Sequence, residues 1–130
     1  RAMAARPGFA SLQIGGAPRY DEYLTLMRSA HLVVDQAYSY TPATNALLAM
    51  AHGIPVVSGA EPPFYHFLNT VEQPIINSPI DVDSMTTLFI HLLDNPAMLA
   101  PLGAASRRFV LRHNAATTVA RRFLTFWQRP

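Results

Sequence analysis

The segment "SYTPATNALLAMAHGIPVV", which runs from Ser39 to Val57, decides the fold of this chain. It predicts a helix from Pro42 to His52, a tight turn at Gly53 and a buried strand from Ile54 to Val57. A helix that leads through a glycine turn into a short apolar strand is typical of proteins with a parallel sheet. The segment therefore indicates an α/β fold.

The first turn of this predicted helix is suited to hold an anion. Thr41 suits the N-cap and Pro42 the first helical position. The first backbone N–H groups of a helix lack partners within it and carry a positive partial charge. Small residues such as Ala43 and Thr44 leave room for a phosphate at that end. The buried side of the helix is expected to consist of Ala43, Ala46, Leu47, Met50 and Ala51.

Elements of the same kind flank this segment. We predict strands over Phe9–Ile14, His31–Asp35 and Pro74–Asn77, and helices over Tyr20–Ala30 and Pro63–Leu68. From Asp81 or Asp83 onward the chain is predicted helical, with breaks at Asn95-Pro96, Pro101 and Asn114. The predicted fold is an α/β, Rossmann-like three-layer domain with a small parallel sheet of three or four strands. Residues 1–130 form a single domain fragment, with strands and helices over 9–78 and a helical cover over 81–128.

Composition limits the class of protein. Half of the 130 residues are hydrophobic and 14% are charged, which is typical of one globular domain. The absence of cysteine excludes disulfides and thiolate metal sites and suits the cytosol. The five histidines have no metal-ligand spacing, so we expect no metal. The chain opens on Arg1 rather than Met, which indicates a fragment of a longer protein.

Charge is distributed unevenly along the chain. Residues 1–106 hold four arginines and eight acids, whereas residues 107–130 hold six arginines and no acid. A basic tail of this kind meets phosphate, nucleic acid or anionic lipid, or forms a solvated helix face. Its apolar residues, among them Phe123, Phe126 and Trp127, recur at helical spacing and are interpreted as packing.

Polar loops follow the predicted strands. They are Gly15–Ala17, Asp35–Tyr38, Ser58–Glu61 and Asn77-Ser78. Ligands of open α/β sheets bind outside the carboxyl ends of the strands, so these loops form the expected ligand edge. Asp35 is either a site residue or a loop cap. Asp81-Val82-Asp83 matches a D-x-D metal signature, but its place at a helix start favours N-capping.

Three stretches give the chain a family resemblance. "YDEYLTLMRSAHLVVDQ", "ALLAMAHGIPVV" and "LLDNPAMLAPLGAASRRFVLRH" resemble the C-terminal nucleotide-sugar-binding domain of GT-B glycosyltransferases, in the retaining "group 1" branch. The resemblance covers nearly the whole chain from Phe9. It implies transfer of a sugar from a nucleotide diphosphate donor to an acceptor hydroxyl with retention, without a metal or other cofactor. The helix N-terminus and basic side chains stabilise the leaving diphosphate in that family.

The resemblance also implies a donor site. The diphosphate would bind at Ala43, Thr44 and Asn45, and the base near Gly15, Gly16 and Tyr20. The donor sugar would lie near Tyr40 and Thr41.

The chain departs from the family at two glutamates. The corresponding residues here are Tyr40 and Leu48, and the glycine before the helix is Ala43. Leu48 cannot accept a hydrogen bond, and an unpaired ribose hydroxyl would cost about 1–3 kcal/mol. Three interpretations stay open: a divergent branch, a domain that has lost catalysis and serves in binding or scaffolding, or Glu61 as a substitute carboxylate.

Partners follow from the same resemblance. They are a nucleotide-sugar donor and, through a missing N-terminal domain, an acceptor saccharide or lipid-linked acceptor. Peripheral contact with a membrane is a further expectation, and a nucleic-acid partner is not expected. The implied location is the cytoplasm, at the membrane face. Because the acceptor domain and part of the donor domain are missing, the chain alone is expected to be inactive.

Overall fold

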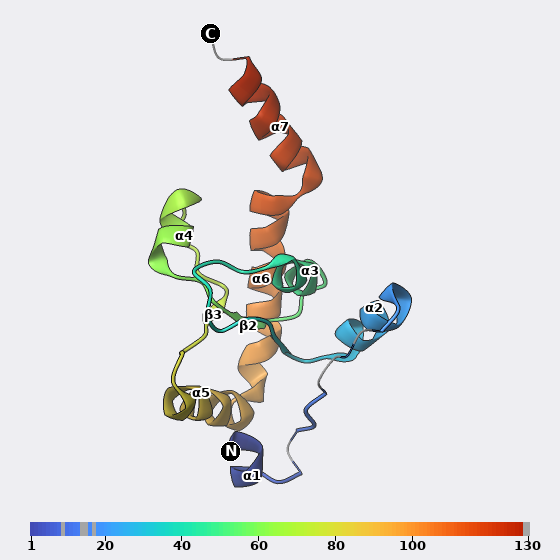
Figure 1. Cartoon of the computed structure of the whole chain (residues 1–130), viewed down its shortest axis with the longest axis vertical. Coiled ribbons are helices and arrows are strands. Elements are labelled where there is room, and N and C mark those ends of the chain that lie inside the picture. Colours follow the sequence, from blue (N-terminus) through green and yellow to red (C-terminus); the bar gives the residue numbers. More distant parts are fainter. Residues whose placement is uncertain (9, 14–15, 17, 129–130) are drawn as a thin grey trace.

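A small parallel sheet organises the molecule (Figure 1). The computed structural model describes residues 1–8, 10–13, 16 and 18–128. Its three strands are β1 (Val33–Val34), β2 (Val56–Ser58) and β3 (Ile76–Asn77), in the order β1-β2-β3 and all parallel. The α/β class and the small parallel sheet predicted from the sequence are confirmed.

Helices make up most of the rest of the described chain. They are α1 (Ala2–Ala5), α2 (Tyr20–Ser29), α3 (Thr44–Ala51), α4 (Pro62–Phe67), α5 (Val82–Asp94), the 3₁₀ helix η1 (Pro96–Met98), α6 (Leu99–Asn114) and α7 (Ala116–Trp127). Each predicted helix is present, with ends shifted by a few residues. No single helix of this part of the chain is long and apolar enough to cross a membrane, although α5 and the helices after it pass that test together as a pair bent by 86°.

The core lies around the central strand. Val56 and Val57 of β2 point to opposite faces of the sheet and both are fully buried, so both faces are covered. α3 packs against β1 and β2, and α6 packs across α3. Phe109 of α6 is fully buried against the rings of Phe64 and Tyr65 from α4. Three helices therefore meet in one core beside the sheet.

The predicted strand over Phe9–Ile14 is wrong in its described part. Residues 10–13 form no strand, and Leu12 is 66% exposed. Phe9 and Ile14 themselves lie outside the described residues. A strand needs a neighbour for its backbone groups, and residues 10–13 pair with none of the three strands. β1 is consequently an edge strand, and Val34 is 49% exposed where we expected burial.

The expected breaks in the C-terminal helices are also corrected. Pro101 does not interrupt α6, because it stands in the first turn, where a missing N–H breaks no helical bond. α7 begins after Ala115 and not after Asn114, whose Oδ1 is buried without a hydrogen-bond partner among the described residues. The predicted packing of Phe123, Phe126 and Trp127 is wrong, because α7 buries no residue.

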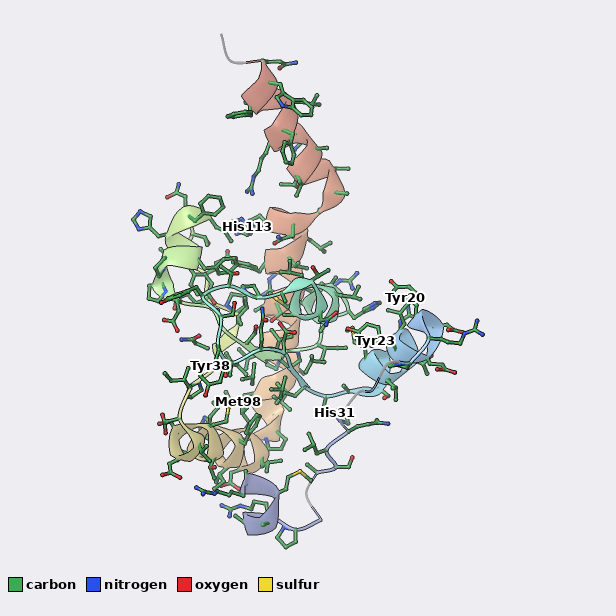
Figure 2. All side chains as sticks on the ribbon, viewed as in Figure 1. Tyr20, Tyr23, His31, Tyr38, Met98 and His113 are labelled. Carbon is green, nitrogen blue, oxygen red and sulfur yellow. The ribbon has the colours of Figure 1, made fainter. Side chains whose placement is uncertain are left out.

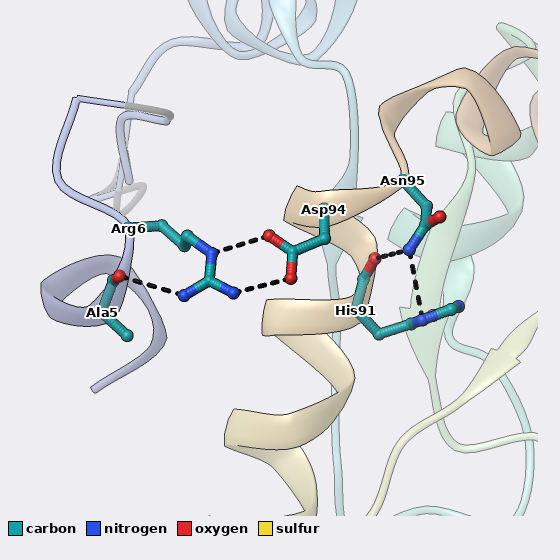
Figure 3. A network of polar contacts seen from close by, with 5 residues as sticks. All are labelled: Ala5, Arg6, His91, Asp94 and Asn95. Carbon is teal, nitrogen blue, oxygen red and sulfur yellow. Dashed lines mark hydrogen bonds and ion pairs between the residues drawn. The ribbon is translucent and has the colours of Figure 1, made fainter.

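Ion pairs attach the N-terminus to α5. The guanidinium of Arg6 donates two hydrogen bonds of 2.7 Å to the two carboxylate oxygens of Asp94 (Figure 3). Arg1 pairs with Asp83 over 2.7 Å. Arg6 holds the pKa of Asp94 below its ordinary value by hydrogen bonding. The Arg1–Asp83 pair is largely exposed and the Arg6–Asp94 pair is partly exposed, so these contacts position α1 more than they stabilise the fold.

A buried histidine marks the junction of α6 and α7 (Figure 2). His113 is 7% exposed, stacks at 4.7 Å between ring centroids on Phe109, and has no hydrogen-bond partner for either ring nitrogen among the described residues. Burial lowers the pKa of His113 below its ordinary value, and the charges of Arg122 and Arg112 lower it further. Burial and these charges therefore favour the neutral form of the imidazole in the folded protein.

This histidine predicts a pH dependence of stability. Below about pH 6.5 the unfolded state protonates His113 while the folded state resists, so the unfolded state binds more protons. The free energy of unfolding is therefore expected to fall as pH drops from about 7 to about 5.5, before carboxylates titrate. Urea unfolding at a series of pH values measures the slope. A His113→Leu variant that kept the whole slope over this window would contradict the assignment.

Candidate functional site

A groove of about 560 Å³ lies between the N-terminal ends of α2 and α3. One wall comes from α2 and the residues before it, namely Gly16, Pro18, Tyr20 and Tyr23, and the other from α3, namely Thr44, Asn45 and Leu48. Gly16 and Tyr20 were predicted for the base, and Thr44 and Asn45 for the diphosphate. The fold thus brings residues from two predicted subsites around one groove. Gly15, also predicted for the base, lies outside the described residues.

Tyr23 joins the two walls of this groove. Its hydroxyl donates to Oδ1 of Asn45 over 3.2 Å, and Figure 2 shows Tyr23 on the side of α2 that faces α3. Burial raises the pKa of Tyr23, with smaller contributions from Asp35 and Tyr20. Tyr23 is not among the site residues predicted from the sequence. Its spacing of three residues from Tyr20, which puts both rings on one face of α2, is the signal that could have found it.

The first turn of α3 presents free backbone donors. The helix begins at Thr44 with Ala43 as its N-cap, so the predicted start at Pro42 and the predicted cap Thr41 are wrong. No side chain in the described part of the chain caps the helix, and the N–H groups of its first turn point toward its N-terminal end. A negatively charged group in the groove beside Thr44 and Asn45 would meet these donors.

Asp35 explains the shifted start of α3. Its Oδ2 accepts the N–H of Ala43 over 3.2 Å and the hydroxyl of Ser58 over 3.3 Å. The hydroxyl of Ser39 donates to the carbonyl oxygen of Thr41 over 2.7 Å. These bonds hold residues 41–43 in a loop. Asp35 therefore acts as a cap for the loop, the second of the two roles considered for it.

A second group of predicted residues lies on the loops after β1 and β2. The N–H of Glu61 donates to the carbonyl of Tyr40 over 3.0 Å, which brings these two residues together. Glu61 also accepts from Nδ2 of Asn77 over 3.1 Å. Four of the predicted residues do not line the groove, namely Tyr40, Thr41, Ala43 and Glu61. The first three lie in the chain just before Thr44, and Glu61 lies in the loop that is bonded to Tyr40.

Gly59 makes this second group possible. A Cβ at Gly59 would stand 1.7 Å from the carbonyl oxygen of Ser39, so only glycine allows the two loops to approach so closely. The N–H of Gly59 donates to the carbonyl of Gln36 over 2.8 Å. The loops after β1 and β2 are therefore bonded to each other by backbone contacts on both sides of Ser39.

The charges around the groove are few. Among the residues that the structure describes, none that lines the groove is a cation or a carboxylate. Arg19, the N-cap of α2, lies 3.5 Å from the carboxylate of Asp21. Leu48 adds an apolar surface to the groove. Polar recognition in the groove therefore depends on the α3 backbone, Thr44, Asn45 and the two tyrosines.

The remaining sequence predictions have simple outcomes. Asp81 caps α5, because its Oδ1 accepts the N–H of Ser84 over 2.7 Å, and this bond lowers the pKa of Asp81. The D-x-D pattern thus serves as a helix cap. No group of three histidines and carboxylates within the described part of the chain is placed to hold a metal ion.

Comparison with known proteins gives no relative. No protein-family model, curated protein or solved structure matches this chain.

Proposed function

We propose that this chain is the donor-binding part of a GT-B glycosyltransferase and that the groove between α2 and α3 binds a nucleotide-sugar. The observation that carries the proposal is the meeting of Gly16, Tyr20, Thr44 and Asn45 around one groove. The family resemblance assigns Gly16 and Tyr20 to the base and Thr44 and Asn45 to the diphosphate. The volume of about 560 Å³ is within the range of about 300–1,000 Å³ typical of small-molecule sites.

Each part of the donor has a partner in this arrangement. The diphosphate lies at the first turn of α3, where the N–H groups and the hydroxyl of Thr44 meet its oxygens. The base lies between the loop at Gly16 and the ring of Tyr20, which is 68% exposed and free to stack. The sugar extends toward Tyr40 and Thr41, and Glu61 is bonded to that loop through Tyr40.

The reaction is a transfer of the sugar to an acceptor hydroxyl with retention. The negative charge that develops on the departing diphosphate is stabilised by the α3 N-terminus. Further cations and the acceptor come from protein outside this chain, because none of the described residues that line the groove is cationic. The enzyme is active only when the protein that supplies the acceptor and the further cations is present.

A second candidate function is a non-catalytic domain of the same fold that binds or scaffolds. It is favoured by Leu48, which lines the groove and leaves a ribose hydroxyl without an acceptor. It is also favoured by the position of Glu61, whose carboxylate is bonded to Asn77 and does not line the groove.

Calorimetric titration tests the proposal. The chain is titrated with UDP, GDP and ADP and with their sugars, and saturable binding of one nucleotide series is expected. Asn45→Asp puts a negative charge at the α3 N-terminus and is expected to weaken binding at least about tenfold. Thr44→Tyr fills the groove and is expected to abolish binding. Asn69→Asp, the same change at an exposed residue after α4, should bind as the unchanged chain does.

The results separate the two candidates. Tighter binding of the nucleotide-sugar than of the free diphosphate supports the glycosyltransferase, because the sugar then makes contacts of its own. Equal affinities support the non-catalytic domain. If a folded chain binds none of these compounds, the donor-site proposal is wrong. If Glu61→Ala leaves donor affinity unchanged, Glu61 is not the substitute carboxylate.

A further inference from the structure

A buried histidine lies at the point where α7 leaves the body of the protein. His113 occupies the last turn of α6, and Figure 2 shows it on the side of α6 that faces α4. The structure describes all five histidines of the chain, and only His113 is buried. Neither of its ring nitrogens has a hydrogen-bond partner among the described residues. The site therefore suits a neutral ring and offers a protonated ring no acceptor from that part of the chain.

The junction next to His113 is short and lightly held. A single residue, Ala115, separates α6 from α7, and its ψ of 137° takes the backbone out of the helical conformation. No residue of α7 is buried, and α6 is the element that α7 mainly contacts (Figure 1). Arg122 of α7 donates to the carbonyl oxygen of His113 over 3.4 Å. α7 is therefore attached through the last turn of α6, and this attachment can open while the core stays folded.

The groups around His113 disfavour its protonation in the closed junction. Burial lowers the pKa of His113, and the charges of Arg122 on α7 and Arg112 on α6 lower it further. Glu72, in the loop after α4, raises the pKa of His113, but its carboxylate is already paired with Arg112. Tyr65 of α4 stays uncharged near neutral pH, because burial raises its pKa to about 12. A proton on His113 thus places a third cation beside two arginines.

We propose that the junction of α6 and α7 is a pH-operated hinge, in which protonation of His113 drives its ring out of the buried site and releases α7 from the body of the protein. Water then reaches the ring and Oδ1 of Asn114, which is also buried without a partner among the described residues. Phe109, one turn before His113, stays packed against α4 and limits the opening to the end of α6. The inference goes beyond the proposed function and does not depend on it.

The direction of the response follows from proton binding. Opening exposes His113 to water, where its pKa is about 6.5, so below that pH the open state binds a proton more readily than the closed state. Uptake of one proton raises the equilibrium constant for opening by up to about tenfold per pH unit. Unfolding of the whole chain exposes the same ring but also disrupts the core around Phe109, so the release of α7 requires less free energy. We therefore expect α7 to be released first as the pH falls.

Hydrogen exchange of backbone amides tests the hinge at its own residues. Exchange is measured at about pH 7.5, 6.5 and 5.5, on both sides of the ordinary histidine pKa, and is corrected for its intrinsic dependence on pH. Amides in the last turn of α6 are expected to lose about tenfold in protection between the two lower values, and so are those of α7, because a free helix of 12 residues is marginal in water. Amides of β2 should keep their protection. The fluorescence anisotropy of Trp127, the only tryptophan and part of α7, should fall over the same range.

Variants of His113 separate the hinge from general effects of acid. His113→Leu and His113→Gln cannot be protonated, and both are expected to remove the pH dependence of exchange at the end of α6. His113→Lys brings a cation to the site and is expected to show the released state already at the highest pH. His66→Leu, which changes an exposed histidine on α4, is the matched control and should respond as the unchanged chain does. Circular dichroism verifies that each variant is folded.

Three results would overturn the proposal. One is protection at the end of α6 that does not change over the pH series. Another is a loss of protection in His113→Leu and His113→Gln as large as in the unchanged chain, which would assign the response to another group. The third is an equal loss of protection in β2, which would mean that the whole chain unfolds and that no hinge opens by itself.

Discussion

Replacing Gly103 with alanine is expected to lower the free energy of unfolding by about 3 kcal/mol. Gly103 is buried on α6 where this helix crosses the turn between α3 and β2. A Cβ there would stand 2.0 Å from the carbonyl oxygen of Gly53 and 3.2 Å from Cδ of Pro55. The nearest atom belongs to backbone, which cannot rotate away as a side chain does. Urea unfolding of both proteins measures the difference.

Helix propensity alone predicts the opposite effect, a higher free energy of unfolding, so the measurement distinguishes the two expectations. Alanine in place of glycine within a helix stabilises by about 1 kcal/mol where nothing obstructs the methyl group. Gly16→Ala is the matched control, because no atom lies within 4 Å of its added Cβ. It should leave stability within about 0.5 kcal/mol of the original. If Gly103→Ala is as stable as the original chain, α6 does not approach the turn at Gly53 as described.

The same turn shows how far local signals determine the fold. The helix, the turn and the strand between Ser39 and Val57 were predicted correctly in kind and order, because each signal lies within the segment. Gly53 has φ of 78°, which glycine adopts without strain. The start of the helix was wrong because its cause lies elsewhere. Asp35, eight residues before Ala43, accepts the Ala43 N–H and holds the preceding residues out of the helix.

The candidate site, too, could be predicted only in part from the sequence. The resemblance placed Thr44 and Asn45 with Gly16 and Tyr20, and the structure brings these residues around one groove. Whether that groove binds a donor stays a prediction. Helical spacing indicates that Tyr23 shares a face of α2 with Tyr20, but it does not show what that face contacts, because the same spacing fits residues of the core. Its bond to Asn45 depends on how α2 lies against α3, and that is a property of the tertiary structure.

The C-terminal helices show the limit of periodicity. Repeating apolar residues predict that a helix has an apolar face, but they do not say what covers it. Phe109 on α6 and Phe123 on α7 both belong to stretches with apolar residues at helical spacing, yet one is fully buried and the other is 54% exposed. The difference arises because α6 passes over α3 and α4, whereas α7 passes beyond them (Figure 1).

Replacing Phe109 with alanine is accordingly expected to lower the free energy of unfolding by about 4 kcal/mol. The ring is fully buried and lies 6.1 Å from Tyr65 and 4.7 Å from His113, between ring centroids. Its removal leaves a cavity where α4 and α6 meet, and neighbours on two helices cannot both move to fill it. Urea unfolding at pH 7 measures the loss, and a domain of ordinary stability has only about 5–15 kcal/mol in total.

Phe123→Ala is the matched control, since it removes the same ring from the exposed face of α7. It is expected to change the free energy of unfolding by no more than about 0.5 kcal/mol. A cost similar to that of Phe109→Ala would mean that α7 folds back onto the body of the protein. A small loss of stability for both substitutions would instead mean that Phe109 does not lie at the centre of the core.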